Sequence, residues 1–194
     1  MSAQGPSLEA LRQLLASGVP PGRSDEDSVR RQWWAALACL QEEFLLPLQP
    51  RSGLWLASPL PALYEPDLLR HLQGWVWAPE ELGNLLQPAP PLLPGRAPAP
   101  DRAGAYDPGR FARLPLGAAD GTDPLLLVIT PHLQIAMALH GPADGRQLLV
   151  RTDPASLSAG LALLDERLQR SAPEEGLRLR QALQALGNLE SDSH

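Results

Sequence analysis

The residues that could bind a ligand gather in the last third of the chain. His132, Gln134 and His140 lie along one apolar run, and Arg151 lies in the next. Side chains alternate between the faces of a strand, so Gln134 and His140 should share a small, partly polar face with two alanines. With His132 and Arg151 beside it, this face could line a pocket that reads an anion or a polar cofactor. The alternative is that a helix packs closely on it.

Signatures of catalysis and metal binding do not occur in the sequence. We find no GxSxG, HExxH, P-loop or GxGxxG pattern. Cys39 is the single cysteine, which excludes an internal disulfide and a multi-cysteine zinc site. His132 and His140 have no third ligand at close spacing, so no metal site is expected. We therefore expect a protein that is not an enzyme and has no cofactor, with Cys39 as a small buried hydrophobe.

Two groups of apolar residues could face a protein partner. Trp75 and Trp77 share one face of an extended segment; large aromatics usually belong to the core, but Trp is also enriched at interfaces. A leucine stripe on the last expected helix could form a two-fold contact; it comprises Leu179, Leu183 and Leu186. We expect a homodimer and favour this stripe as its interface.

The elements that position these residues follow from apolar periodicity and from capping residues. Residues 125–130, 133–139 and 148–152 read as three strands, with Asp144 and Gly145 in the loop before the third. Asp153 can cap a following helix, which begins with Pro154. One face of that helix is apolar, and its stripe consists of Leu157, Leu161, Leu164 and Leu168. A last helix starts at 172–174 and ends at Gly187.

The first half of the chain is predicted to be mainly helical, with a helical subregion at residues 1–50. Ser7 caps a helix that ends at Gly18, and Ser24 or Asp25 caps a longer one that Pro47 closes. The apolar stripe of the longer helix is Val29, Trp33, Leu37, Leu40 and Phe44. Further expected elements are a strand at 53–57 and helices at 66–74 and 80–86.

These patterns predict an α/β fold in one domain that spans residues 1–194. We expect a small central antiparallel sheet of about four or five strands with flanking helices, in the style of small sensory domains. Residues 88–113 have the composition of a proline-rich loop inside this domain. Seven residues of the strands and the following helix should be buried together: Leu127, Ile129, Ile135, Met137, Leu139, Leu161 and Leu164.

Charge and hydropathy exclude several classes of protein. The net charge of −6 and the pI near 5.2 argue against nucleic acid as a partner, because phosphates require a concentrated basic surface. No apolar run approaches the roughly 18 to 20 residues that span a bilayer, and the N-terminus lacks signal-peptide features. We expect a cytoplasmic protein with no membrane contact.

The segments LLLVITP, QIAMALHG and GRQLLVRTDP, followed by a Leu-rich helix that ends LLDERL, occur in this order. Over roughly residues 114 to 187 the chain resembles the N-terminal input region of cyanobacterial sensor histidine kinases. In that family a short antiparallel sheet and its helices precede the phosphoacceptor helix and the ATP-binding domain. Neither a phosphoacceptor helix nor an ATP lid occurs in this sequence, so kinase activity is not implied.

The resemblance implies a role in two-component signal transduction. We expect a sensory or protein-interaction input domain that binds a protein partner or a small-molecule signal and passes the signal through its C-terminal helix. The alternative is a stand-alone scaffold or adaptor protein without kinase output.

Overall fold

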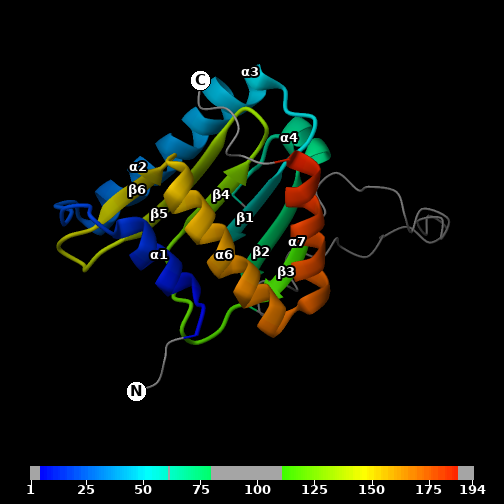
Figure 1. The fold of residues 1–194 in the computed structure, drawn as a ribbon. Helices are drawn as coiled ribbons and strands as arrows, with labels where there is room; N and C mark the ends of the chain where they lie inside the picture. Colours follow the sequence, from blue (N-terminus) through cyan, green and yellow to red (C-terminus); the bar gives the residue numbers. More distant parts are fainter. Residues whose placement is uncertain (1–4, 61, 80–110, 188–194) are drawn as a thin grey trace, which may run out of the picture.

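A computed structural model describes residues 5–60, 62–79 and 111–187 of the chain. Their six-stranded sheet, with strand order β3-β2-β1-β4-β5-β6, lies between two layers of helices (Figure 1). The strands are β1 (Leu54–Ser58), β2 (Gln73–Ala78), β3 (Ala112–Pro115), β4 (Leu125–Ile129), β5 (Gln134–His140) and β6 (Gln147–Arg151). The predicted α/β class is confirmed, although the sheet is mixed and larger than expected.

The helices begin and end close to the residues that the capping pattern predicts. They are α1 (Leu8–Ala16), α2 (Glu26–Cys39), the π-helix η1 (Leu40–Leu45), α3 (Leu46–Leu48), α4 (Pro66–His71), α6 (Pro154–Ser171) and α7 (Pro173–Leu186). Ser7, Asp25 and Asp153 each accept a hydrogen bond from a backbone N–H in the first turn of their helix. Gly187 follows the last residue of α7. No helix of the described residues is long and apolar enough to cross a membrane.

Parallel and antiparallel strand pairs meet in the middle of the sheet. β1, β2 and β3 run parallel to one another, whereas β4 pairs antiparallel with β1 and continues into the antiparallel strands β5 and β6. A parallel pair needs a crossover connection, and α4 lies in the crossover between β1 and β2. The expectation of an antiparallel sheet was therefore correct for β4–β6 and wrong for β1–β3.

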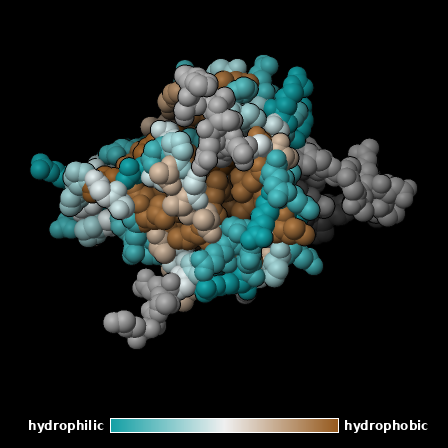
Figure 2. Space-filling model, viewed as in Figure 1, coloured by the Kyte–Doolittle hydropathy of each residue, from teal (hydrophilic) through white to brown (hydrophobic). Residues whose placement is uncertain are grey.

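The sheet has two hydrophobic faces, each with its own helices. The front face, which is toward the viewer in Figure 1, is covered by α1, α6 and α7, and the back face by α2, η1 and α4. Figure 2 shows the front layer, with hydrophobic residues between its helices and hydrophilic side chains along their outer sides. The expected N-terminal helical region is thus divided, because α1 lies on one face and α2 on the other.

The seven residues predicted to be buried together are divided between these faces. Leu127, Ile129, Leu161 and Leu164 belong to the front cluster, and Ile135, Met137 and Leu139 pack in the back cluster. The strand alternation was assigned correctly, but α6 covers the opposite face of β5 from the one expected. Small side chains leave room for close helix packing, and the two central front-facing residues of β5, Ala136 and Ala138, are alanines.

The helix that follows α2 departs from the predicted apolar stripe at its end. Leu37 and Leu40 are buried as expected, but Phe44 is 52% exposed. The π-helix η1 has a wider turn than an α-helix, and this shifts the phase of the residues that follow. Leu45 therefore takes the buried place predicted for Phe44.

Three smaller expectations also need correction. Cys39 is exposed rather than buried. Asp144 and Gly145 lie in the β5–β6 loop as expected, but the glycine that turns the chain there with a positive φ, of 113°, is Gly141. Most of the predicted 88–113 loop and the predicted helix 80–86 lie outside the described residues, but Ala112 and Arg113 already belong to β3.

Candidate functional site

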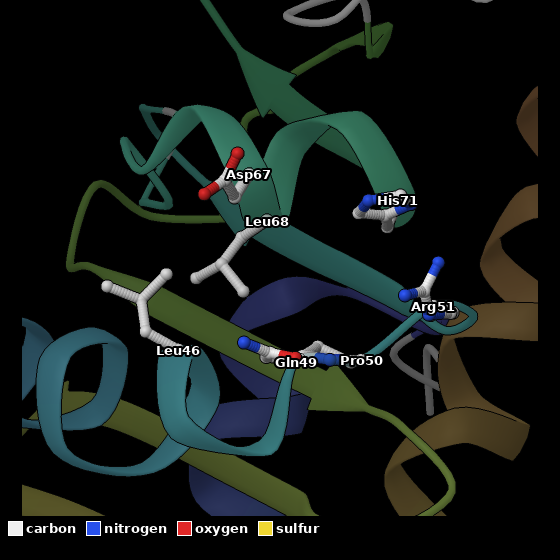
Figure 3. Close-up of a pocket in the computed structure, with 7 residues that line it drawn as sticks. All are labelled: Leu46, Gln49, Pro50, Arg51, Asp67, Leu68 and His71. Atoms are coloured by element: carbon white, nitrogen blue, oxygen red, sulfur yellow. The ribbon is translucent and has the colours of Figure 1, made fainter.

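An open pocket lies on the back of the molecule, between α3 and α4 (Figure 3). Its volume is about 400 Å³, and it is lined by Leu46, Gln49, Pro50, Arg51, Asp67, Leu68 and His71. Pockets of this size hold small organic molecules. It is the candidate site of this domain, because its lining combines an apolar floor with charged groups.

The connection from α3 to β1 forms one wall of the pocket. Gln49 ends α3 in the left-handed conformation with φ 46°, and its N–H donates to Leu45 and Leu46. Residues other than glycine rarely adopt this conformation, which costs free energy and is more frequent at functional sites. Pro50 is buried directly after it, so the chain turns sharply and presents Arg51 at the pocket's rim.

The helix α4 forms the other wall. Pro66 occupies its first turn, and the helix ends at His71, two residues before β2 begins. Arg51 and His71 thus precede β1 and β2, which are parallel neighbours paired from Leu54 and Gln73 onward. The parallel pairing brings the guanidinium of Arg51 and the imidazole of His71 to the same end of the pocket, as Figure 3 shows.

The apolar and the charged side chains lie at different places along the pocket. Leu46 and Leu68 point toward each other across the middle, and the carboxylate of Asp67 points away from Arg51 and His71 (Figure 3). Asp67 Oδ1 lies 3.7 Å from a guanidinium nitrogen of Arg70, a pair on the exposed surface. The guanidinium of Arg51 can bind a carboxylate or phosphate through two parallel N–H donors, and the imidazole of His71 can add a third.

A metal centre is not supported in the described part of the chain. No group of three or more His, Cys, Asp and Glu side chains that could hold an ion occurs there. Asp67 and His71 lie one helical turn apart in the pocket, but two ligands rarely make a site. The chemistry available in this pocket is the binding of an anionic group.

The four predicted ligand-binding residues lie elsewhere, and none of them lines the pocket between α3 and α4. His132 is exposed in the turn before β5, and the side-chain amide of Gln134 donates to the carbonyl of Thr130 at 2.5 Å. His140 Nδ1 lies 3.7 Å from Glu9 Oε1 on α1. Arg151 donates to the carbonyls of Leu15, at 2.9 Å, and Ser17. α1 packs on this face of β5 and β6, as the alternative expected, and a ligand-binding role of the four residues stays a prediction.

The two tryptophans of the predicted interface are buried in the described fold. Trp75 and Trp77 are 0% and 1% exposed and belong to the front core. The indole N–H of Trp75 donates to Glu175 Oε2 of α7 at 2.8 Å, and the guanidinium of Arg178 lies 6.0 Å from the Trp75 ring centroid. Both tryptophans are buried because β2 is an internal strand with α7 above it.

The leucine stripe of α7 is part of the same core. Leu179 is fully buried, and Leu183 and Leu186 are partly buried against the front cluster. Leu179 therefore serves the core of this domain. The interface role of the partly buried Leu183 and Leu186 stays a prediction.

A cluster of buried charges under α1 serves the fold. Asp120 is fully buried and accepts hydrogen bonds from the backbone N–H groups of Leu8 and Gly117 and from Arg167. The guanidinium of Arg12, also fully buried, donates to the carbonyls of Asp120 and Asp123. These contacts join α1, α6 and the loop before β4, so the cluster acts as a structural brace.

Sequence reasoning missed the pocket residues Arg51 and His71. The available signal was weak: a cationic residue lies just before each of two apolar runs that begin at Leu54 and near Trp75. That signal has meaning only if the two runs are parallel neighbours, which the sequence does not indicate.

Comparison with known proteins gives a family and no function. A family model described as "Domain of unknown function (DUF8628)" matches residues 9–194. No curated protein and no solved structure matches. Since the match covers nearly all of the described fold, including both walls of the pocket, the chain belongs to the DUF8628 family of domains of unknown function.

Proposed function

We propose that this domain is a sensory or regulatory binding module that takes a small amphipathic anion into the pocket between α3 and α4. The observation that carries the proposal is the placement of Arg51 and His71 at one end of an apolar floor. A carboxylate or phosphate would lie against the guanidinium of Arg51 and an N–H of the His71 imidazole, and an apolar body would cover Leu46 and Leu68.

Physical chemistry favours a ligand with this distribution of charge. Burial of apolar surface contributes about 25 cal/mol per Å² to binding, while the charged end sets the orientation of the ligand. A charge-assisted hydrogen bond from Arg51 is stronger than a neutral one. The carboxylate of Asp67 at the far side disfavours a second negative charge there, so a monoanion fits best.

The pocket is also placed where a signal could reach the C-terminal helix. His71 is followed by β2, and Trp75 of β2 is hydrogen-bonded to Glu175 of α7. A ligand changes an equilibrium between two states only if it binds one of them better, and a shift of α4 against α3 is the corresponding change here. This arrangement suits a cytoplasmic input domain of a two-component kinase, which is the role that the sequence resemblance implies. The description of the matching family does not mention kinases.

The second candidate is a scaffold or adaptor that binds a protein. Its support is the exposure of large apolar side chains on the outer helix of the back layer: Trp34, Phe44 and Leu48 are 62%, 52% and 41% exposed. Large exposed apolar residues are frequent where partners bind.

Calorimetric titration with octanoate, and with octylamine as the matched cation, tests the ligand proposal. We expect octanoate to bind and octylamine to bind at least about tenfold more weakly, because only the carboxylate can pair with Arg51. Arg51→Met should abolish binding of octanoate. Arg70→Met removes an arginine of the same helix layer that does not line the pocket, and it should leave binding unchanged. Equal binding of the two ligands, or equal loss in both variants, would overturn the proposal.

A further inference from the structure

The strand β6 forms one edge of the sheet and leaves part of its backbone unpaired. On its inner side β6 pairs with β5, from Gln147 with His140 to Arg151 with Ala136. On its outer side Arg146 exchanges two hydrogen bonds with Ser24, at 3.0 and 3.2 Å. Backbone groups of alternate residues point to the same side of a strand. Leu148 and Val150 therefore direct their N–H and C=O groups outward, as Arg146 does.

Beyond Arg146, no described segment pairs with the outer side of β6. The segment that contains Ser24 is the only described part of the chain that pairs with the outer side near β6. Val150 is 50% exposed, although its strand position is apolar. The opposite edge strand, β3, is short and ends at Pro115, a feature that discourages further pairing. Of the two edges, β6 is the one open to another strand.

We propose that β6 pairs antiparallel with β6 of a second copy of this chain, about a two-fold axis at Leu149. In this register Leu148 lies opposite Val150 of the second copy, and Val150 lies opposite Leu148. Both are hydrogen-bonded pairs, since these residues carry the outward N–H and C=O groups. The two sheets then join into one continuous sheet.

The side chains of β6 are complementary to themselves in this register. Leu148 and Val150 form an apolar pair on the back face, which covers the exposed Val150. On the front face Gln147 lies opposite Arg151, so no like charges meet. A two-fold contact requires this self-complementarity, which an unrelated extended peptide has no reason to supply.

The ends of the strand also fit a second copy. The next outward position after the paired residues is Arg146, which Ser24 already occupies. β6 ends at Arg151, and Asp153 then caps α6, so the chain turns away before it reaches Ser24 of the second copy. The pairing is limited to residues 147–151.

Sedimentation equilibrium over a range of concentrations tests the proposal. We expect the parent chain to reach the mass of a dimer. Val150→Pro should weaken the dimer at least about tenfold with an unchanged circular dichroism spectrum, because it removes an outward N–H and none that bonds to β5. Val150→Thr, which keeps the N–H and the branched shape, should still dimerise. Val150→Lys keeps the backbone and should also give monomers, which covers the case that the proline variant does not fold.

Amide hydrogen exchange gives a second readout. In the dimer the N–H groups of Leu148 and Val150 should be protected like that of Leu149, which faces β5. In Val150→Lys the Leu148 amide should exchange faster, while the Leu149 amide stays protected. A parent chain that is monomeric at every concentration, or a Val150→Lys variant that remains a dimer, would overturn the proposal.

Discussion

The front and back layers of the sheet are held in different ways. In front, buried charges join α1, α6 and the loop before β4, and Arg12 and Asp120 are fully buried. At the back, η1 and α4 rest mainly on hydrophobic contacts, and the buried Arg146 ties α2 to the sheet through Glu26 at 2.8 Å. This layer carries the pocket and the exposed residues Trp34 and Phe44. Both layers bury a hydrophobic core, but the fully buried acid Asp120 lies in the front layer and the pocket lies in the back layer.

Removal of the charge at the centre of the front layer should have the largest effect. Asp120→Ala leaves two backbone N–H groups and Arg167 without their acceptor, so we expect a loss of about 3–5 kcal/mol in the free energy of unfolding. Urea denaturation measures it. Asp67→Ala, which removes an exposed carboxylate from the back layer, should change stability by less than about 0.5 kcal/mol. Equal losses would remove the distinction between the layers.

In the back layer, the stability of the fold should depend on which side chain of the π-helix η1 faces the core. Leu45→Ala should cost about 2–5 kcal/mol because Leu45 is fully buried. Phe44→Ala, at the neighbouring position, should be close to neutral because Phe44 is mostly exposed. Thermal denaturation of the two variants compares them. A larger loss for Phe44→Ala would mean that the helix continues without the π-turn.

The smallest expected effect on stability comes from the aspartates that cap one helix in each layer, Asp25 at α2 and Asp153 at α6. Hydrogen bonds from Ser28 lower the pKa of Asp25, in the back layer, below its ordinary value of 3.8. Hydrogen bonds from Ser156 lower the pKa of Asp153, in the front layer, in the same direction. A lowered pKa stabilises the fold above pH 3.8, and this stabilisation is lost as the pH falls through the folded pKa.

Thermal melts at decreasing pH test the caps. Asp25→Asn and Asp153→Asn should each have a lower melting temperature than the parent at neutral pH. Each should also lose less stability than the parent as the pH falls below 3.8. Melting curves of parent and variants that stay parallel across this range would contradict the role of these carboxylates.

Local features of the fold could be predicted from the sequence. Ser7, Asp25 and Asp153 cap their helices through contacts within a few residues, so capping chemistry sufficed. The alternation along β5 was also correct. The choice of helix for each face was not, because it depends on the shapes of surfaces far apart in the chain.

Features that depend on strand order could not be predicted. Trp75 and Trp77 are buried because β2 lies between β1 and β3, and β3 begins inside a proline-rich segment without a strand pattern. Arg51 and His71 meet only because β1 and β2 run parallel. The left-handed turn at Gln49 has no signal in residue type, since glycine or asparagine is usual there.

The position of α1 sets the order in which the chain can fold during its synthesis. The N–H of Leu8 bonds to Asp120, 112 residues later, and Arg151 bonds to the carbonyl of Leu15 across 136 residues. The ribosome makes α1 long before β5, β6 and α6 exist, so Leu8, Leu11 and Leu15 emerge without the surface that buries them. Such delayed contacts slow folding and leave apolar surface open to chaperones. Of the described helices, α1 is made first and is among the last to reach its place.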